Sequence, residues 1–248
     1  MNDKNNQPGG VWDTTKTVFY AVMIAVFVRS FFLEPFDIPS GSMIPSLLVG
    51  DYLFVTKTSY GYSRHSFPLS MPLVKGRVFY TEPKRGDVIV FKLPSDNRTD
   101  YIKRLIGMPG DRVQVRSGRL FINGTMVQRE KDGDYVTRDP YSGKAVRYTK
   151  YVEILPEGLK HSILEISDNG AFDNTDEFTV PEDHFFFMGD NRDNSLDSRS
   201  VQVGFVPKVN LVGKARFLFF SHDDSASWWQ VWRWPMAVRW KRLFNGIK

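Results

Sequence analysis

A serine and a lysine in this sequence have the surroundings expected of a nucleophile and a base. Ser42 lies in residues 38–43 (Ile-Pro-Ser-Gly-Ser-Met), where proline and glycine fix a loop and leave the hydroxyl exposed. Lys103 lies in residues 101–105 (Tyr-Ile-Lys-Arg-Leu), an apolar run that leads into a Pro-Gly turn. If this run is a strand, Lys103 shares one face with the side chains two residues away. Such a lysine is usually an edge residue whose ammonium reaches water, and otherwise a desolvated base.

A third segment is dense in polar side chains. Residues 189–199 read Gly-Asp-Asn-Arg-Asp-Asn-Ser-Leu-Asp-Ser-Arg and follow a hydrophobic run at residues 184–188. A segment of this composition is usually a solvated loop, but it could equally be a hydrogen-bonding scaffold behind a site. Its carboxylates resemble a calcium loop only loosely, because Arg192 stands where a ligand is needed. The four histidines lie apart without ligand spacing, so no metal site is predicted.

Composition and charge exclude several other classes of function. The 248 residues include no cysteine, which excludes a cysteine nucleophile, a thiolate metal site and a disulfide framework. The net charge of +5 reflects 33 basic and 28 acidic residues, and five basic residues with no acidic one lie in residues 225–248. The rest of the chain is therefore formally neutral. Proteins that bind nucleic acid spread cations over a face of the fold, so nucleic acid is not an expected partner.

The elements that position these residues begin with an apolar N-terminal segment. After a polar lead at residues 1–10, which we expect to be disordered, residues 11–33 are apolar with charges only near the ends. About twenty residues are needed to span the hydrocarbon of a bilayer. A cleaved secretory signal is the alternative, but residues 34–37 (Glu-Pro-Phe-Asp) make a poor cleavage site. A core helix is a second alternative. The sequence favours one transmembrane helix over residues 11–33.

Beyond this segment the pattern is that of a mainly β protein. Short runs rich in β-branched and aromatic residues are separated by Gly, Pro and Asn-Gly turn signals, with no long helical pattern between them. We expect a catalytic β domain from residues 34–130 and 184–222. Residues 131–183 are more polar and richer in turns, and we expect them to form an inserted β subdomain.

The C-terminal tail, residues 223–248, differs from the body in composition. It holds five of the six tryptophans, interleaved with its basic residues. Aromatic rings and cations together are typical of a segment that lies in the interface of a membrane. A tail packed on the domain is the alternative, and Pro235 limits any continuous helix. We expect an interfacial tail.

Taken together, the three motifs resemble those of the bacterial type I signal peptidases. That family is marked by Ser-Gly-Ser-Met with a downstream proline, Gly-Asp before a β run, Tyr-Ile-Lys-Arg with Gly-x-Pro-Gly-Asp, and Gly-Asp-Asn-Arg-Asp-Asn-Ser-x-Asp-Ser-Arg. All four occur here in the same order, and the likeness runs from about Glu34 to Phe220. Two features depart from the pattern. One apolar segment precedes Ser42, whereas some members have two, and the spacer after Arg199 is longer than usual.

The resemblance implies a signal-peptidase-like β-rich catalytic domain and a membrane-bound serine endopeptidase with a Ser–Lys dyad and no cofactor. It makes Ser42 the nucleophile and Lys103 the general base. The Ser42 N–H and the Ser40 hydroxyl would stabilise the oxyanion, and Ser195 would hydrogen-bond the Lys103 ammonium. The other supporting residues would be an ion pair and two residues that shape the backbone behind the lysine: Asp197 with Arg199, and Gly189 with Asp190.

The physical chemistry of lysine agrees with this assignment. A lysine with its ordinary pKa of about 10.4 is protonated at neutral pH and cannot accept a proton. Burial among apolar groups can lower this pKa by roughly 3–5 pH units, because the charged form loses its hydration. Lys103 must therefore act from a dry, apolar environment.

The resemblance also implies the substrate, which is the N-terminal signal peptide of an exported preprotein, cut after a small-x-small site. The extended substrate is expected to add a strand to a sheet edge. Leu33 and Ser42 are nine residues apart, at most about 30 Å, which holds the nucleophile near the bilayer surface. The side chains expected to line the shallow substrate pockets are Phe36, Ile38, Leu47 and Ile102.

These inferences predict the partners and the location of the protein. The partners are preprotein signal peptides and membrane lipid, with no nucleic acid and no metal. Function, rather than flanking charge, places the catalytic domain on the periplasmic or extracytoplasmic side of the bacterial inner (cytoplasmic) membrane, as a single-pass protein. Three alternatives stay open: a soluble Ser–Lys self-cleaving repressor, a membrane-tethered β domain that only binds envelope proteins, and a specialised relative with one dedicated substrate.

Overall fold

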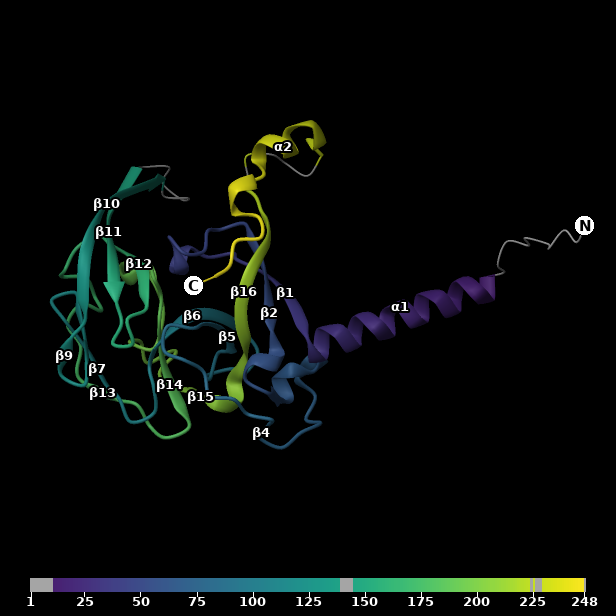
Figure 1. Ribbon diagram of the computed structural model, residues 1–248, viewed down its shortest axis with the longest axis horizontal. Helices are drawn as coiled ribbons and strands as arrows, with labels where there is room; N and C mark the ends of the chain where they lie inside the picture. The colour runs from purple at the N-terminus through teal and green to yellow at the C-terminus, as the bar shows by residue number, and fades with distance from the viewer. Residues whose placement is uncertain (1–10, 139–144, 224, 226–228, 248) are drawn as a thin grey trace, which may run out of the picture.

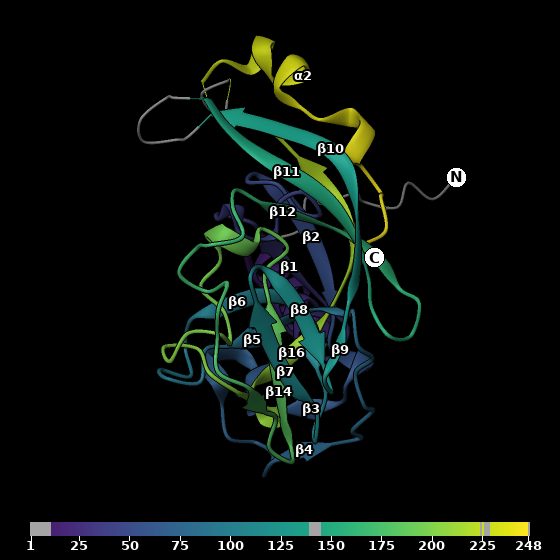
Figure 2. The same ribbon diagram turned by 90° about the vertical axis from the view of Figure 1, so that its left-hand side faces the viewer.

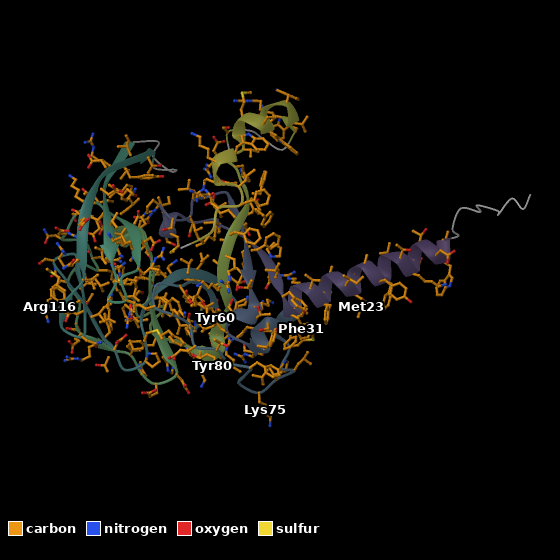
Figure 3. The ribbon with its side chains drawn as sticks, in the orientation of Figure 1. Met23, Phe31, Tyr60, Lys75, Tyr80 and Arg116 are labelled. Atoms are coloured by element: carbon orange, nitrogen blue, oxygen red, sulfur yellow. The ribbon has the colours of Figure 1, made fainter. Side chains whose placement is uncertain are left out.

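The computed structural model describes residues 11–138, 145–223, 225 and 229–247, and the polar lead predicted for residues 1–10 lies outside this part of the chain. Helix α1 (Val11–Phe31) has 21 residues and is about 32 Å long. It is long and apolar enough to cross a membrane. Figure 1 shows it projecting from the β body, and Figure 3 shows Met23 on the projecting part and Phe31 where the helix joins the body. The helix ends before Leu33, which already pairs with Thr56 in a sheet.

A seven-stranded antiparallel sheet carries the segments singled out in the sequence. Its C-terminal strand β16 (Leu211–Ser221) lies between β2 (Asp51–Thr56) and β5 (Val88–Lys92). It thereby joins the N-terminal strands to the strands that follow them in the sheet. In sheet order, the strands are β1 (Leu33–Asp37), β2 (Asp51–Thr56), β16 (Leu211–Ser221), β5 (Val88–Lys92), β6 (Asp100–Gly107), β14 (His184–Met188) and β15 (Val206–Pro207).

Two smaller sheets extend this body. In the turn between β8 (Arg119–Ile122) and β9 (Thr125–Met126), Asn123 and Gly124 have φ of 53° and 77°. These values suit the tight turns that Asn-Gly favours between antiparallel strands. The four-stranded sheet consists, in order, of β13 (Phe178–Thr179), β7 (Arg112–Arg116), β8 (Arg119–Ile122) and β9 (Thr125–Met126), and the two-stranded sheet of β3 (Tyr62–Ser63) and β4 (Arg77–Val78).

A separate three-stranded sheet stands beside the body. It consists of β10 (Gln128–Arg138), β11 (Ala145–Ile154) and β12 (Lys160–Glu165). Figure 2 shows the β10–β11 hairpin extending to the same end of the molecule as the C-terminal helix α2 (Trp234–Ala237). The segment predicted as an inserted subdomain, residues 131–183, thus contributes to this sheet and, through β13, to the sheet of β7. Strand β10 begins three residues before that predicted boundary because Gln128 already pairs with Ile154.

One of the hydrophobic clusters fixes the loop that carries Ser42. Met43 and Leu47 of this loop are fully buried, together with Leu53 and Val55 of β2. Burial of a side chain of this size stabilises the fold by about 1.5–3 kcal/mol. The loop is therefore held from beneath by the sheet. The prediction of a mainly β protein with one N-terminal apolar helix is confirmed.

The described part of the tail is partly packed on the body and partly exposed. Its last residues return to β16, where the Phe244 N–H donates to the Leu218 carbonyl at 2.7 Å. The Arg242 guanidinium also pairs with Asp51 at 2.5 Å. The indole rings of Trp229 and Trp232 are exposed.

The remaining short elements are 3₁₀ turns: η1 (Gly41–Met43), η2 (Lys57–Ser59), η3 (Arg64–Ser66), η4 (Pro68–Ser70), η5 (Arg192–Asn194), η6 (Lys208–Asn210), η7 (Val231–Arg233) and η8 (Trp240–Arg242).

Candidate active site

Ser42 lies in the single turn η1, between strands β1 and β2. The Ile44 N–H donates to the Gly41 carbonyl at 3.2 Å and the Leu47 N–H to the Met43 carbonyl at 2.9 Å, which closes the loop on itself. Ser42 is 8% exposed, and it lines a cleft of 390 Å³. The turn therefore presents a largely buried hydroxyl to the floor of a cleft.

Lys103 reaches this hydroxyl from strand β6. Its Nζ lies 2.7 Å from the Ser42 Oγ and donates to the Ile102 carbonyl at 3.0 Å. Lys103 is 4% exposed, and its Nζ also lies 5.2 Å from the centre of the Tyr101 ring. The two residues that the sequence singled out are therefore in hydrogen-bonding contact.

The pKa of Lys103 is suited to proton transfer. Burial lowers this pKa from its ordinary value of 10.5 to about 8, because the ammonium loses hydration and the neutral amine does not. The negative charges of Asp197 and Asp190 act in the opposite direction and limit the decrease. A fraction of Lys103 is therefore neutral near pH 7.

Gly189 allows the segment that follows β14 to approach the nucleophile closely. A Cβ atom at this position would lie 2.2 Å from the Ser195 Oγ and 2.5 Å from the Ser42 carbonyl oxygen. Both distances are too short for any side chain, so glycine is required here. The neighbouring Asn191 holds the same loop, because its backbone N–H donates to the Ser42 carbonyl at 3.1 Å and its Nδ2 to the Gly41 carbonyl at 3.1 Å.

Asp190 forms a buried ion pair behind the lysine. Arg104, the residue after Lys103, donates to both of its carboxylate oxygens, at 2.8 and 2.7 Å. Ser46 donates to the same carboxylate at 2.5 Å. Burial alone would raise the pKa of Asp190, but the attraction of Arg104 outweighs it and holds this pKa below its ordinary value. Asp190 thus joins β6, the Ser42 loop and the segment after β14.

The predicted ion pair of Asp197 with Arg199 is present. Arg199 donates to both carboxylate oxygens at 2.9 Å, and both side chains are almost fully buried. Asp197 also accepts a hydrogen bond from the Gly189 N–H at 3.0 Å. Burial would raise the pKa of Asp197, but Arg199 opposes this and keeps the carboxylate charged. The pair therefore fixes the backbone of Gly189 against the nucleophile loop.

The two supporting serines differ in their geometry. The Ser40 Oγ lies 3.3 Å from the Ser42 Oγ at the rim of the cleft. The Ser195 hydroxyl is buried, and the structure shows no hydrogen bond between it and the Lys103 ammonium. It lies close to Asp197 and helps to hold the pKa of that carboxylate low.

The cleft beside Ser42 brings together most of the predicted substrate-binding residues. Phe36, Ile38 and Ile102 line it. Leu47 does not line it, because the loop folds over after Ser42 and buries this side chain in the core. Strand β6 pairs with β5 from Asp100 to Arg104, and with β14 only from Arg104 onward. Its first half is therefore a free edge beside the cleft, to which an extended peptide can add.

The sequence analysis missed a buried ion pair that connects the site to the three-stranded sheet. Arg192 donates to both oxygens of Glu153 on β11, at 3.0 and 2.5 Å, and its Nε donates to the Gly189 carbonyl at 3.2 Å. No motif around Glu153 in the sequence predicts this contact, which joins residues 39 positions apart.

The described residues include no group of three or more side chains that could hold a metal ion.

Comparison with known proteins places the chain in a family. A model of the family described as signal peptidase, peptidase S26, matches residues 11–220. Signal peptidase I of Rickettsia typhi is 40% identical over 247 residues, which cover 92% of this chain and 90% of that protein. This chain belongs to the signal peptidase I family. Signal peptidase I of Rickettsia massiliae is 37% identical over 265 residues, covering 99% of this chain and 97% of that protein.

Membership of the signal peptidase I family defines the general activity. The chain is a peptidase that cleaves signal peptides from preproteins. Its apolar helix α1, together with membership of this family, indicates a membrane-anchored enzyme. A crystal structure of signal peptidase I from Enterococcus faecalis V583 is 27% identical, covers 54% of this chain and 97% of that chain, and has a TM-score of 0.32.

Proposed function

We propose that this signal peptidase cleaves preproteins by attack of the Ser42 Oγ on the scissile carbonyl, with Lys103 as the general base. The observation that carries this proposal is the distance of 2.7 Å between the Lys103 Nζ and the Ser42 Oγ, at a lysine whose pKa is lowered to about 8 by burial. A serine hydroxyl is a weak nucleophile unless a neighbour takes its proton. Neutral Lys103 is placed to take it.

The reaction proceeds in two steps that balance in protons and bonds. The Ser42 Oγ bonds to the scissile carbon while its proton passes to the Lys103 Nζ. The tetrahedral intermediate collapses when the ammonium gives this proton to the leaving amine, which breaks the C–N bond and releases the mature protein. Water then attacks the acyl-enzyme, with Lys103 again as base, and the signal peptide leaves with a free carboxylate. Ser42 and neutral Lys103 are regenerated.

The negative oxygen of each tetrahedral intermediate needs donors that are already in place. We assign this role to the backbone N–H of Ser42 and the hydroxyl of Ser40, which lies 3.3 Å from the Ser42 Oγ. Ser195 and Gly189 shape the wall behind the dyad. Asp190 with Arg104, and Asp197 with Arg199, act as positioning pairs that hold this wall and take no part in proton transfer.

The shape of the cleft supports cleavage after small side chains. Phe36, Ile38 and Ile102 line a hollow of 390 Å³, which is narrow for a peptide segment that also needs room for its backbone. An extended substrate on the free edge of β6 places alternate side chains toward this floor. Small residues at the first and third positions before the cut fit such a floor, which gives the small-x-small rule.

The proposed location is the bacterial inner membrane, with α1 as a single span and the catalytic domain on the periplasmic side. The exposed rings of Trp229, Trp232 and Trp234, with basic residues between them, suit the headgroup region of the bilayer. Figure 1 shows helix α2 of the tail at the top of the β body, above β16, and α1 projecting from the right-hand side of the body. Membrane lipid and preprotein signal peptides are thus the proposed partners, and no nucleic acid is proposed.

The first experiment measures cleavage of a purified preprotein by the intact protein in detergent. Ser42→Ala and Lys103→Met are compared with the wild type, and circular dichroism checks that each is folded. We expect the wild type to cut after a small-x-small site and each variant to lose at least a thousandfold in kcat/KM. Cleavage that survives both substitutions would refute the dyad. A well-folded wild type that cuts no general preprotein would favour a dedicated substrate or a binding role.

A further inference from the structure

A second hollow adjoins the catalytic cleft beside Ser42. It has a volume of 290 Å³. Gly41 and Asn194 line both hollows, so the two adjoin each other next to the nucleophile. The side chains that characterise the second hollow come from three segments: Tyr135 and Tyr148 of the β10–β11 hairpin, Ile44 and Leu48 of the loop after Ser42, and Arg239 of the tail.

A third hollow continues the path in the other direction, toward helix α1. It shares Phe36 and Asp100 with the catalytic cleft and reaches Arg29 and Ser30 at the end of the helix. The three hollows therefore follow one another from the end of α1, past Ser42, to the β10–β11 hairpin. A preprotein whose apolar stretch lies in the bilayer enters this path from the α1 end. Its residues before the scissile bond occupy the catalytic cleft, and its residues after the bond come to the second hollow.

We propose that the second hollow, here named the exit groove, binds the first residues of the mature protein as an extended segment immediately after the scissile bond. This inference rests on the proposed attack by Ser42, which sets the point at which the substrate changes from signal peptide to mature chain. It assigns the β10–β11 hairpin to substrate recognition on the far side of the cut.

The aromatic wall of the exit groove suits an extended peptide. The rings of Tyr135 and Tyr148 lie 6.5 Å apart at an interplanar angle of 64°. Tyr148 is nearly buried, whereas Tyr135 is partly exposed on the rim. Tyrosine offers a flat apolar face and a hydroxyl for main-chain groups, and its side chain has few rotamers to lose on binding. Ile44 and Leu48 complete an apolar floor opposite these rings.

The charge of the exit groove favours one class of side chain. Arg239 is its single cation, and no Asp or Glu is among the described residues that line it. Its guanidinium lies 3.9 Å from Asp51, which is already paired with Arg242 at 2.5 Å, and its charge also acts on Asp223. The guanidinium donates to the neutral Val49 carbonyl at 2.9 Å. Since none of these contacts is a close ion pair, Arg239 still adds positive charge to the groove. Acidic residues just after the cut are attracted by it, and lysine or arginine there is repelled.

The test compares three preprotein substrates that share one signal peptide and cleavage site, using the full-length enzyme in detergent. The first has Asp residues at the second and third positions after the cut, the second has Lys there, and the third ends two residues after the cut. We expect the wild type to cut the Asp substrate about tenfold better than the Lys substrate in kcat/KM. Arg239→Gln should reduce this preference to about twofold. Lys241→Gln, which removes the same charge from an exposed residue outside the groove, should keep it.

The aromatic wall is tested with the same substrates. Tyr135→Ala should lose about tenfold in kcat/KM on the Asp substrate and little on the substrate that ends two residues after the cut. Val136→Ala is the matched control, because Val136 is exposed and lies on the opposite face of β10. Equal loss on the long and the short substrate, or no loss on either, would overturn the proposal, as would an Arg239→Gln enzyme with the full wild-type preference. Cutting of these substrates by Ser42→Ala would instead refute the dyad and leave the comparison among substrates unaffected.

Discussion

Two regions of this protein bury a lysine to nearly the same extent, and the lysines differ in what they contact. Lys57, near the end of α1, is 3% exposed and Lys103 is 4% exposed. The Lys57 ammonium lies 2.8 Å from Glu34 and donates to the Ser66 carbonyl at 2.6 Å. Lys103 instead contacts the Ser42 hydroxyl, and among the described residues no carboxylate pairs with its ammonium.

The difference shows that burial alone does not make a lysine a base. Burial lowers the pKa of both lysines. At Lys57 the hydrogen bond and the charge of Glu34 oppose this effect directly and keep the ammonium paired. At Lys103 the opposing carboxylates act only from a distance, and the pKa is lowered to about 8. A dry lysine becomes available for proton transfer where its contact partner is a neutral hydroxyl.

The largest expected effect concerns stability. The pKa of Lys103 is lowered in the folded state from 10.5 to about 8, so the unfolded chain binds more protons between these pH values and stability rises with pH across that window. Below about pH 8 the full cost of the buried ammonium is present. Lys103→Met should therefore raise the free energy of unfolding by on the order of 3 kcal/mol at pH 7.

This gain should disappear above pH 10.5, the ordinary pKa of the lysine, because the wild-type amine is then neutral in both states. Lys57→Met should give no comparable gain at pH 7, because Glu34 loses a buried partner. Urea titrations of the three proteins at several pH values, followed by circular dichroism, measure the difference. Equal stabilisation by both substitutions would show that the two lysines are equivalent.

The pH dependence of cleavage should follow the protonation of Lys103. With the pKa of Lys103 at about 8, about one tenth of the enzyme has a neutral lysine at pH 7, and nearly all of it above pH 9. We expect kcat/KM on a preprotein to rise about tenfold from pH 7 to pH 9 and then to level off. A profile that is flat or that falls over this range would contradict the role of Lys103 as base.

The smallest effect is expected at Lys57. Lys57→Met should keep kcat/KM within about twofold of the wild type, with an unchanged pH profile, because Arg29 still pairs with Glu34 at 2.6 Å. The same assay over the same pH range measures it. A large loss of cleavage in this variant, in a protein that is still folded, would mean that the Lys57 ammonium itself is needed for the reaction.

The mainly β fold could be predicted from local patterns in the sequence, whereas the dyad was predicted from the resemblance of three motifs to a known family. Short β-rich runs with turn signals gave the strands, and alternation along residues 101–105 put Lys103 on an apolar face. The position of Leu47 could not be predicted in this way. In the sequence of a loop, an apolar residue that lines a pocket cannot be distinguished from one that packs in the core. Leu47 is in the core because the chain turns back toward the sheet after Ser42. The Ser195 hydroxyl is similar, because only the folded structure brings it close to Asp197.

Contacts between distant segments lay beyond the reach of the sequence. The pair of Glu153 with Arg192 connects the three-stranded sheet to the active site, and it depends on how two sheets are placed. The exit groove likewise brings together Tyr135, Leu48 and Arg239 from three separate parts of the chain. The sequence around each of these residues contains no motif that predicts a binding site.

The central place of strand β16 in the seven-stranded sheet has a consequence for the biogenesis of the enzyme. The strand belongs to the last part of the chain to be synthesised, and it lies between β2, which follows the Ser42 loop, and β5, which pairs with the strand of Lys103. An unfinished chain cannot bring the nucleophile and the base into register, because the strand between their two halves is missing. We therefore expect the dyad to assemble only after residues 211–221 have been synthesised and have paired with both β2 and β5.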